Sequence, residues 1–331
     1  MPAHPPSRSL SRSPRSVARV ALHVGKTSLP LYSSRFSRHD FRLAQLFALL
    51  VLRLFHKTDY RGLEQLLRDY TEIQDWLELS RVPDHTTLWR AEQRLRHYVD
   101  DLFEQILAQA LCAGLLEPPI RIALDSTGLE SRHVSRHYLT RCRGAPSRQR
   151  YWPKLAIACH TDTHLWLAFK VARGPGNECV LWTPLLRQAC RHVSVDTALA
   201  DAAFDSEANH ALARKNLGVR LTIIPLNPRI WGRQWPKTTY RRQMRRRFLK
   251  VKYAQRSHVE STFSQHKRRL LSSLRARHTS TRRLEIAFRV LTHNILILLP
   301  AQRVATELPR GRRHHNTGRA PYATRASWNI R

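Results

Sequence analysis

Acidic residues are scarce in this sequence of 331 residues, and their scarcity sets the first constraint on function. Lys and Arg together number 57 against 24 Asp and Glu, so the formal net charge is +33. A chain with this charge is attracted to polyanions, because neutralising phosphates releases their counterions. DNA or RNA is therefore the first candidate partner, and an anionic membrane surface is the second. An arginine-rich proteome would produce the same excess, so the charge alone does not decide the function.

Cysteine is also rare, and the five cysteines show no pairing pattern. Their number is odd, their spacing is irregular and none forms a Cys-x-x-Cys pair, which argues against a disulfide framework and a zinc site. A reducing cytoplasm is the compartment that this usage favours. The cysteines are Cys112, Cys142, Cys159, Cys179 and Cys190.

Long apolar stretches are missing as well. The two most apolar runs cover residues 43–55 and 286–300, and charged residues such as Arg53 and Arg289 interrupt them. Both are shorter than the roughly 18 clean apolar residues that indicate a membrane-spanning helix. We interpret both runs as buried helices and expect no membrane span.

The chain divides into four parts by composition. Residues 1–37 are rich in Ser, Arg and Pro and contain no acid, which predicts a disordered basic arm outside the fold. Residues 38–116 repeat apolar side chains at helical spacing, which predicts a helical domain; a DNA-binding domain and a plain helical bundle are both compatible with it. Residues 117–300 form the expected catalytic domain, and residues 301–331 a second basic tail.

The third part has the pattern of a mixed α/β sheet. Strands are predicted at about 120–127, 154–160 and 165–172, the last two joined by the turn TDTH. Two further strands, DTALAD and VRLTIIPL, alternate with helices, and two long helices follow at about 253–275 and 281–299. We therefore predict an α/β fold in which a mixed sheet is flanked by helices and preceded by an all-α region.

Three acids stand where this architecture would place a site. Asp125 ends the first strand in IALDSTGL, Asp201 ends the fourth in LADAAFDS, and Glu260 lies among Arg and His residues at the start of a helix. Open α/β sheets bind ligands at the carboxyl ends of their strands, so these side chains are expected to converge. Carboxylate oxygens are ligands that Mg²⁺ prefers, and two such ions roughly 3.5–4 Å apart can activate a water and stabilise a leaving oxygen.

Each acid also has an ordinary structural explanation. Asp125 alone could cap the amides of a strand end, and Glu260 could form an ion pair with Arg256 one helical turn earlier. Asp201 competes with two neighbouring aspartates, and for these we predict structural roles: Asp196 in a turn before the strand and Asp205 as a helix cap. Only the combination of the three acids with the strand order points to a metal site.

Around Glu260 the sequence resembles the DDE transposases of bacterial insertion sequences, most closely the IS5 and IS4 groups. The signature of that family is Tyr, two residues, Arg, three residues, Glu, six residues, Lys. Tyr253, Arg256, Glu260 and Lys267 stand at this spacing. IALDSTGL and LADAAFDS resemble the segments that carry the family's first and second aspartates. The resemblance extends over about residues 40–300.

The resemblance implies an RNase H-like catalytic core in which Asp125, Asp201 and Glu260 are the catalytic acids and hold two Mg²⁺ ions, for which Mn²⁺ can substitute. It implies that Tyr253, Arg256 and Lys267 contact DNA or position the strand. About 58 residues separate the second aspartate from the glutamate, so there is no room for the large β insertion of some relatives.

A strongly basic segment, YRRQMRRRFLK, fills part of this interval. We predict that it contacts the DNA backbone, with a solvated loop as the alternative. The nearby WGRQWPK carries Trp231 and Trp235, which could stack on an extruded base, although loop tryptophans usually pack on the core. The arginines expected to bind DNA are Arg241, Arg242, Arg245 and Arg246.

The favoured hypothesis is a DNA transposase that nicks the 3′ ends of an element at its terminal inverted repeats and joins them to target DNA. Its partners would be double-stranded DNA and a second copy of the chain, in the cytoplasm on the nucleoid. A Mg²⁺-dependent nuclease with the same core, which cuts without joining, is the first alternative. A catalytically silent DNA-binding relic or repressor is the second, and the intact set of acids argues against it.

Overall fold

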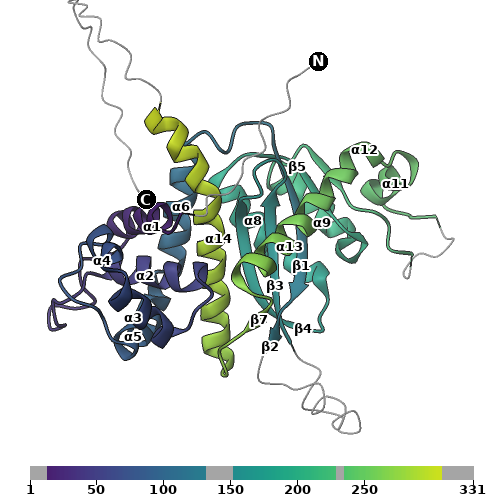
Figure 1. Ribbon diagram of the computed structural model, residues 1–331. Coiled ribbons are helices and arrows are strands. Elements are labelled where there is room, and N and C mark those ends of the chain that lie inside the picture. The colour runs from purple at the N-terminus through teal and green to yellow at the C-terminus, as the bar shows by residue number, and fades with distance from the viewer. Residues whose placement is uncertain (1–12, 132–151, 229–234, 308–331) are drawn as a thin grey trace, which may run out of the picture.

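The computed structural model describes residues 13–131, 152–228 and 235–307, with side chains described up to residue 299. Figure 1 shows a group of helices on one side, a sheet on the other, and the long helix α14 between them. One cluster of buried apolar residues runs through both halves. Trp231 and Cys142 lie outside the described residues.

The N-terminal half is helical, as the apolar spacing predicted. Its helices pack on one another and on α14, and Phe47 of α2 lies 6.2 Å from Phe288 of α14 between ring centroids. The helices are α1 (Pro14–Ser28), α2 (Leu43–Phe55), α3 (Tyr60–Asp69), α4 (Thr71–Trp76), α5 (His85–Leu95), the 3₁₀ turn η1 (Arg96–Tyr98) and α6 (Val99–Cys112).

Helix α1 corrects the expectation that residues 1–37 are a disordered arm. Ser13 caps the helix by accepting a hydrogen bond from the Ser16 amide, and its next residue is Pro14, a favoured first helical position. One face of α1 is buried, and at Gly25 an added Cβ would lie 2.9 Å from the Ala44 Cα of α2. The Ser, Arg and Pro content suggested disorder, but Val and Ala recur in this segment at helical spacing and form an apolar face that packs on α2.

The sheet has five strands in the order β4-β3-β1-β5-β6. β1 pairs parallel with β5 and antiparallel with β3, β3 pairs antiparallel with β4, and β5 pairs parallel with β6. A separate pair, β2 with β7, extends the structure beyond the end of β1. The strands are β1 (Ile120–Gly128), β2 (Glu130–Ser131), β3 (Trp152–His160), β4 (Trp166–Gly174), β5 (Val195–Ala200), β6 (Leu221–Ile223) and β7 (Ser273–Leu274).

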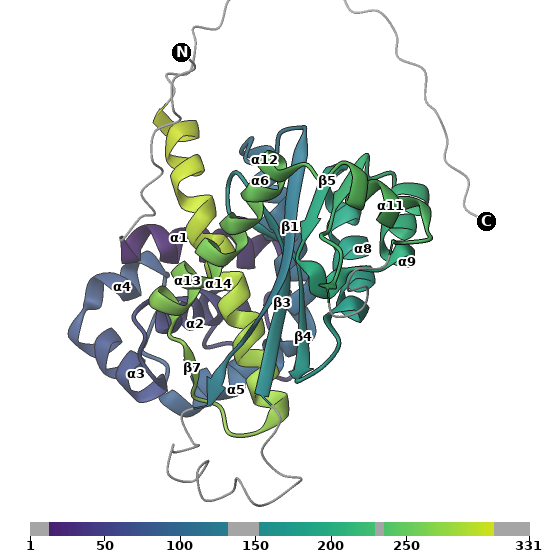
Figure 2. The same cartoon turned by 90° about the vertical axis from the view of Figure 1, so that its right-hand side faces the viewer.

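Helices cover both faces of this sheet. Figure 2 shows α13 and α14 on one side and α8 and α9 on the other. The elements after β4 are η3 (Glu178–Leu181), α8 (Trp182–His192), η4 (Ala202–Phe204), α9 (Glu207–Ala211), the π-helical η5 (Leu212–Asn216), α11 (Thr239–Arg246), α12 (Lys250–Tyr253), η6 (Ala254–Arg256), α13 (Ser257–Leu270) and α14 (Thr279–Glu307).

These elements confirm the predicted α/β fold, a mixed sheet flanked by helices with a helical region before it. Two details differ from the prediction. The helix expected over 253–275 is three consecutive pieces that end at Leu270, where the next residue, Leu271, adopts a positive φ of 76°. Helix α14 continues to Glu307, past the boundary expected at residue 300. Among the described residues, no helix is long and apolar enough to cross a bilayer.

Candidate active site

Asp125 lies on β1 just beyond the last residue that pairs with the parallel strand β5. Leu124 is the last β1 residue paired with β5, opposite Ala200, so the next side chain lies at the carboxyl edge of that pair. The three residues before it are buried, whereas Asp125 itself is only partly buried. Its Oδ1 accepts a hydrogen bond from the Ser126 amide at 2.7 Å. The position follows from an apolar strand that ends in a polar run.

Asp201 follows β5 directly and occupies the equivalent edge. It caps the 3₁₀ turn η4, and its Oδ1 accepts a hydrogen bond from the Ala203 amide at 3.0 Å. Because the two parallel strands end side by side, Asp125 and Asp201 come together as the sequence predicted.

A third carboxylate, Glu178, joins them from η3. Asn177 caps this turn by accepting a hydrogen bond from the Cys179 amide at 2.9 Å, and Glu178 is the first residue of the turn. Its Oε1 accepts hydrogen bonds from Ser126 Oγ at 2.5 Å and from Lys154 Nζ at 2.8 Å. Lys154 lies on β3, and its side chain is only 10% exposed, so the pair is largely removed from water.

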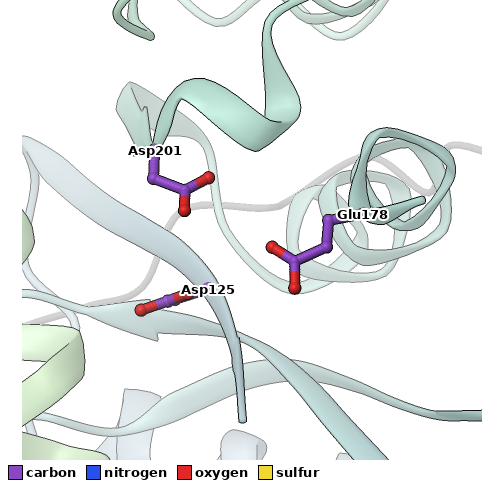
Figure 3. Close-up of side chains that lie close together, drawn as sticks. All are labelled: Asp125, Glu178 and Asp201. Atoms are coloured by element: carbon purple, nitrogen blue, oxygen red, sulfur yellow. The ribbon is translucent and has the colours of Figure 1, made fainter. Parts of the chain in front are cut away.

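The three carboxylates form one cluster. One oxygen from each of Asp125, Glu178 and Asp201 lies within 4.8 Å of the others, and Figure 3 shows the side chains pointing toward a common space. Burial, together with the charges of Asp201 and Glu178, raises the pKa of Asp125 to about 6. Burial and then the charge of Glu178 also raise the pKa of Asp201. A cation placed among these oxygens would relieve both effects.

Glu260 lies beside this cluster rather than within it. It is in the first turn of α13, its side chain is 57% exposed, and it forms an ion pair with Arg256. The same guanidinium approaches Asp125, with Nη1 3.4 Å from Oδ2. Arg256 therefore connects the third predicted acid to the first through a cation of the protein itself.

The remaining motif residues face the same strand end. Lys267 Nζ donates a hydrogen bond to Thr127 Oγ1 at 2.7 Å, two residues beyond Asp125. The Arg256 guanidinium lies 6.0 Å from the centroid of the Tyr253 ring. The helical spacing thus places these motif side chains on the side of the chain that faces β1. Their contact with DNA stays a prediction.

Two neighbouring aspartates are structural, although not in the predicted way. Asp196 lies within β5 rather than before it and binds Arg220 at 2.7 and 3.0 Å. Asp205 is fully buried at its side chain and binds Arg241 at 2.8 Å, instead of capping α9. Arg241 is consequently 13% exposed and is engaged in the core, which leaves little of it for a phosphate.

The other arginines of the basic segment lie on an ordered helix, α11, rather than on a loop. Arg242, Arg245 and Arg246 are exposed, and Arg245 lies 5.9 Å from the ring centroid of Trp235, which is 50% exposed. Helix α11 thus presents cations to solvent, and the DNA-contact prediction rests on these three residues.

Comparison with known proteins identifies the family. A family model described as a transposase DDE domain matches residues 117–297. The chain belongs to this transposase family. No curated protein is similar enough to match it. A solved structure described as a cryo-EM structure of piggyBac transposase synaptic complex with hairpin DNA is similar at 13% identity, covering 88% of this chain and 72% of that chain. The TM-score of this similarity is 0.44.

The DDE transposase family membership confirms the resemblance drawn from the motif around Glu260, while the IS5 or IS4 grouping stays a prediction. Sequence reasoning missed Glu178. The signal available was GPGNECV, in which turn residues precede a capping Asn and an acid at a helix start. An acid at a helix start usually serves the helix, so only the folded chain reveals its neighbours.

Proposed function

We propose that this DDE transposase cuts the 3′ ends of an insertion sequence at its terminal inverted repeats and joins them to target DNA. The observation that supports this proposal best is the convergence of Asp125 and Asp201 at the sheet edge. Glu260 is linked to Asp125 through the guanidinium of Arg256, which contacts both. Both aspartates sit in a protein with a formal charge of +33, which favours a polyanionic substrate.

The side chains at the sheet edge fit divalent cations. The cluster at this edge consists of carboxylate oxygens, which Mg²⁺ and Mn²⁺ prefer as ligands. Burial, and then the neighbouring carboxylates Asp201 and Glu178, raise the pKa of Asp125, and a bound cation would favour its charged form. Asp125, Asp201 and Glu260 would hold two Mg²⁺ ions. Bound there, the ions would activate water and stabilise the leaving oxygen of an in-line displacement.

The chain's own residues supply positioning. Arg256 and Lys267 lie beside the end of β1, where a phosphate next to the acids would need cations. The exposed arginines of α11 extend the basic surface away from the acids. Helices α2 to α6 would bind the terminal repeats, and pairing of two ends would require a homodimer on DNA, in the cytoplasm on the nucleoid.

The test is cleavage and joining of a labelled DNA end taken from the gene's own flanks, with Mg²⁺ or Mn²⁺. Wild type is expected to give joined product and Glu260→Gln none. Glu130→Gln, an exposed carboxylate after β1, serves as the matched control and should behave as wild type. Cutting without joining would instead identify a nuclease. Equal DNA binding by all three proteins with no cutting would identify a binding protein.

A further inference from the structure

Four carboxylates, rather than three, surround the end of β1, and they fall into two groups. Glu178 shares the space between Asp125 and Asp201, with oxygens of all three within 4.8 Å. Glu260 is not among these oxygens and instead pairs with Arg256. The two glutamates therefore differ in one respect that matters for a cation: Glu178 faces the acids directly, and Glu260 faces them across a guanidinium.

Glu178 is also the better fixed of the two. Lys154 and Ser126 hold its Oε1, and its side chain is 21% exposed against 57% for Glu260. Only Oε1 carries these two bonds. These two bonds hold the carboxylate beside Asp125 and Asp201 before any ion binds. A ligand that is held in place before the ion arrives costs little ordering entropy when the ion binds.

Arg256 stands where its charge competes with a cation. Its guanidinium contacts Asp125 at 3.4 Å and pairs with Glu260, and its side chain is 20% exposed. Arginine forms strong, geometrically matched contacts with phosphates as well as with carboxylates. A DNA phosphate at the site would therefore be an alternative partner for the same guanidinium.

We propose that Glu178, with Asp125 and Asp201, forms the cation site of the DNA-free protein, and that Arg256 holds Glu260 out of it until a DNA phosphate takes the guanidinium. This inference rests on the proposed function, because it assigns an order to the assembly of the same active site. It also requires reciprocity: a cation bound at Glu260 would strengthen the hold of Arg256 on phosphate by the factor by which phosphate strengthens the cation.

The experiment is Mn²⁺ binding to DNA-free protein at pH 7.5, measured from the electron paramagnetic resonance signal of free Mn²⁺. Wild type, Glu260→Gln and the exposed control Glu130→Gln are expected to bind one ion with equal affinity. Glu178→Gln is expected to bind it at least tenfold more weakly. Glu178→Asp, which keeps the charge, should recover part of the loss, and this separates loss of a ligand from misfolding.

Folding of each variant is checked by its melting temperature without metal, and the shift that Mn²⁺ adds is a second measure of binding, since a bound ion stabilises the folded state by mass action. Wild-type affinity in Glu178→Gln would overturn the inference. So would a tenfold loss in Glu260→Gln, or the absence of any binding by DNA-free wild type.

The hold of Arg256 on Glu260 is tested by a double-mutant cycle. Arg256→Gln is expected to bind Mn²⁺ several-fold more tightly or to bind a second ion, and Arg256→Gln with Glu260→Gln is expected to lose this gain. An equal gain in both proteins would show that Arg256 competes with the cation through its contact with Asp125 rather than by holding Glu260, and would overturn this part. If these patterns hold while wild type neither cuts nor joins DNA, the proposed function fails and the cation site stands. If wild type joins DNA but Glu178→Gln binds Mn²⁺ normally, only this inference fails.

Discussion

The acids in the interior and the acids at the sheet edge differ in how many basic side chains contact them. Interior carboxylates each have an arginine in close contact: Glu92 binds Arg53 at 3.0 Å and Glu285 binds Arg289 at 2.6 Å, with every side chain no more than 6% exposed. At the sheet edge, four acids share two cations, Lys154 and Arg256.

Asp201 shows the contrast most clearly. Within the described residues it has no lysine or arginine in salt-bridge contact, although Asp205, four positions later, is bound by Arg241. Asp201 is partly buried, and a charge removed from water without a partner is costly. The chain has 57 basic residues, any of which could have supplied a partner. We propose that a bound cation supplies the charge that no protein side chain supplies at Asp201.

The largest expected effect separates these two aspartates by function. Asp201→Asn should lower the rate of DNA cleavage by about 10⁴-fold or more, which corresponds to more than about 5 kcal/mol in the barrier, because one ligand of the cation is lost. Asp205→Asn should retain cleavage when rates are expressed per folded molecule. Single-turnover cleavage of a labelled end measures both. Similar losses in the two variants would contradict the division between them.

The free energy of unfolding should distinguish Asp201 and Asp205 in the opposite order, with the larger loss at Asp205. Asp205→Asn leaves Arg241 without its partner in a site where the aspartate is fully buried, so the free energy of unfolding should fall by about 3–5 kcal/mol. Asp201→Asn should lose none, since burial already disfavours the charged form there. Guanidinium denaturation without metal measures both. A destabilised Asp201→Asn would mean that this carboxylate is structural.

Cation binding should depend on pH through Asp125. Its pKa is raised to about 6, and a carboxylate must lose its proton before it can bind a metal ion. Mn²⁺ affinity is therefore expected to be nearly constant from pH 8 to 7 and to fall by up to about tenfold per unit below pH 6. Titrations of wild type at pH 7.5, 6.0 and 5.0 measure this. A constant affinity across this range would show that Asp125 is no ligand.

The metal-free protein should show a smaller effect with a definite sign. Because the folded pKa of Asp125 is raised, its contribution to stability is fully present below the unfolded value near 3.8 and is lost as pH rises through about 6. Asp125→Asn, which is always neutral, should therefore be about 1–2 kcal/mol more stable than wild type at pH 7.5, after allowing for the lost Arg256 contact. At pH 4 the two should be equal.

Chemical denaturation at the two pH values provides the measurement for Asp125→Asn. Equal stability at pH 7.5 would mean that Arg256 fully compensates the buried charge. The comparison between interior and sheet-edge acids would then lose its energetic basis, although the geometry of the cluster would remain.

Much of this organisation follows from the sequence. The strand ends could be predicted because apolar runs stop at Asp125 and Asp201, and parallel strands bring their carboxyl ends together. The motif from Tyr253 to Lys267 could be placed on one side of a helical segment because its spacing is short-range. The family model that matches residues 117–297 includes these positions.

What could not be predicted depends on contacts distant in sequence. Glu178 meets Asp125 across 53 positions, and Asp205 meets Arg241 across 36. No local pattern encodes either contact. For the same reason the sequence could not show that Arg241 points into the core while Arg245, one turn later on α11, points to solvent. In the sequence Arg241 and Arg245 are equivalent members of a basic segment, and only the packing of the folded chain shows that one is engaged with Asp205 and the other is exposed.

This pair supplies the smallest and most specific prediction. Arg245→Ala should weaken DNA binding by a modest factor at physiological salt and should reduce the slope of log affinity against log salt by about 0.9, as expected when one phosphate contact is lost. Arg241→Ala should leave the slope unchanged and should instead lower the free energy of unfolding, because it strands the buried Asp205. Fluorescence anisotropy across a salt series, with denaturation in parallel, measures both. If Arg241→Ala also reduces the slope, its guanidinium leaves Asp205 for DNA. The exchange between carboxylate and phosphate proposed for Arg256 would then occur at two places in this protein.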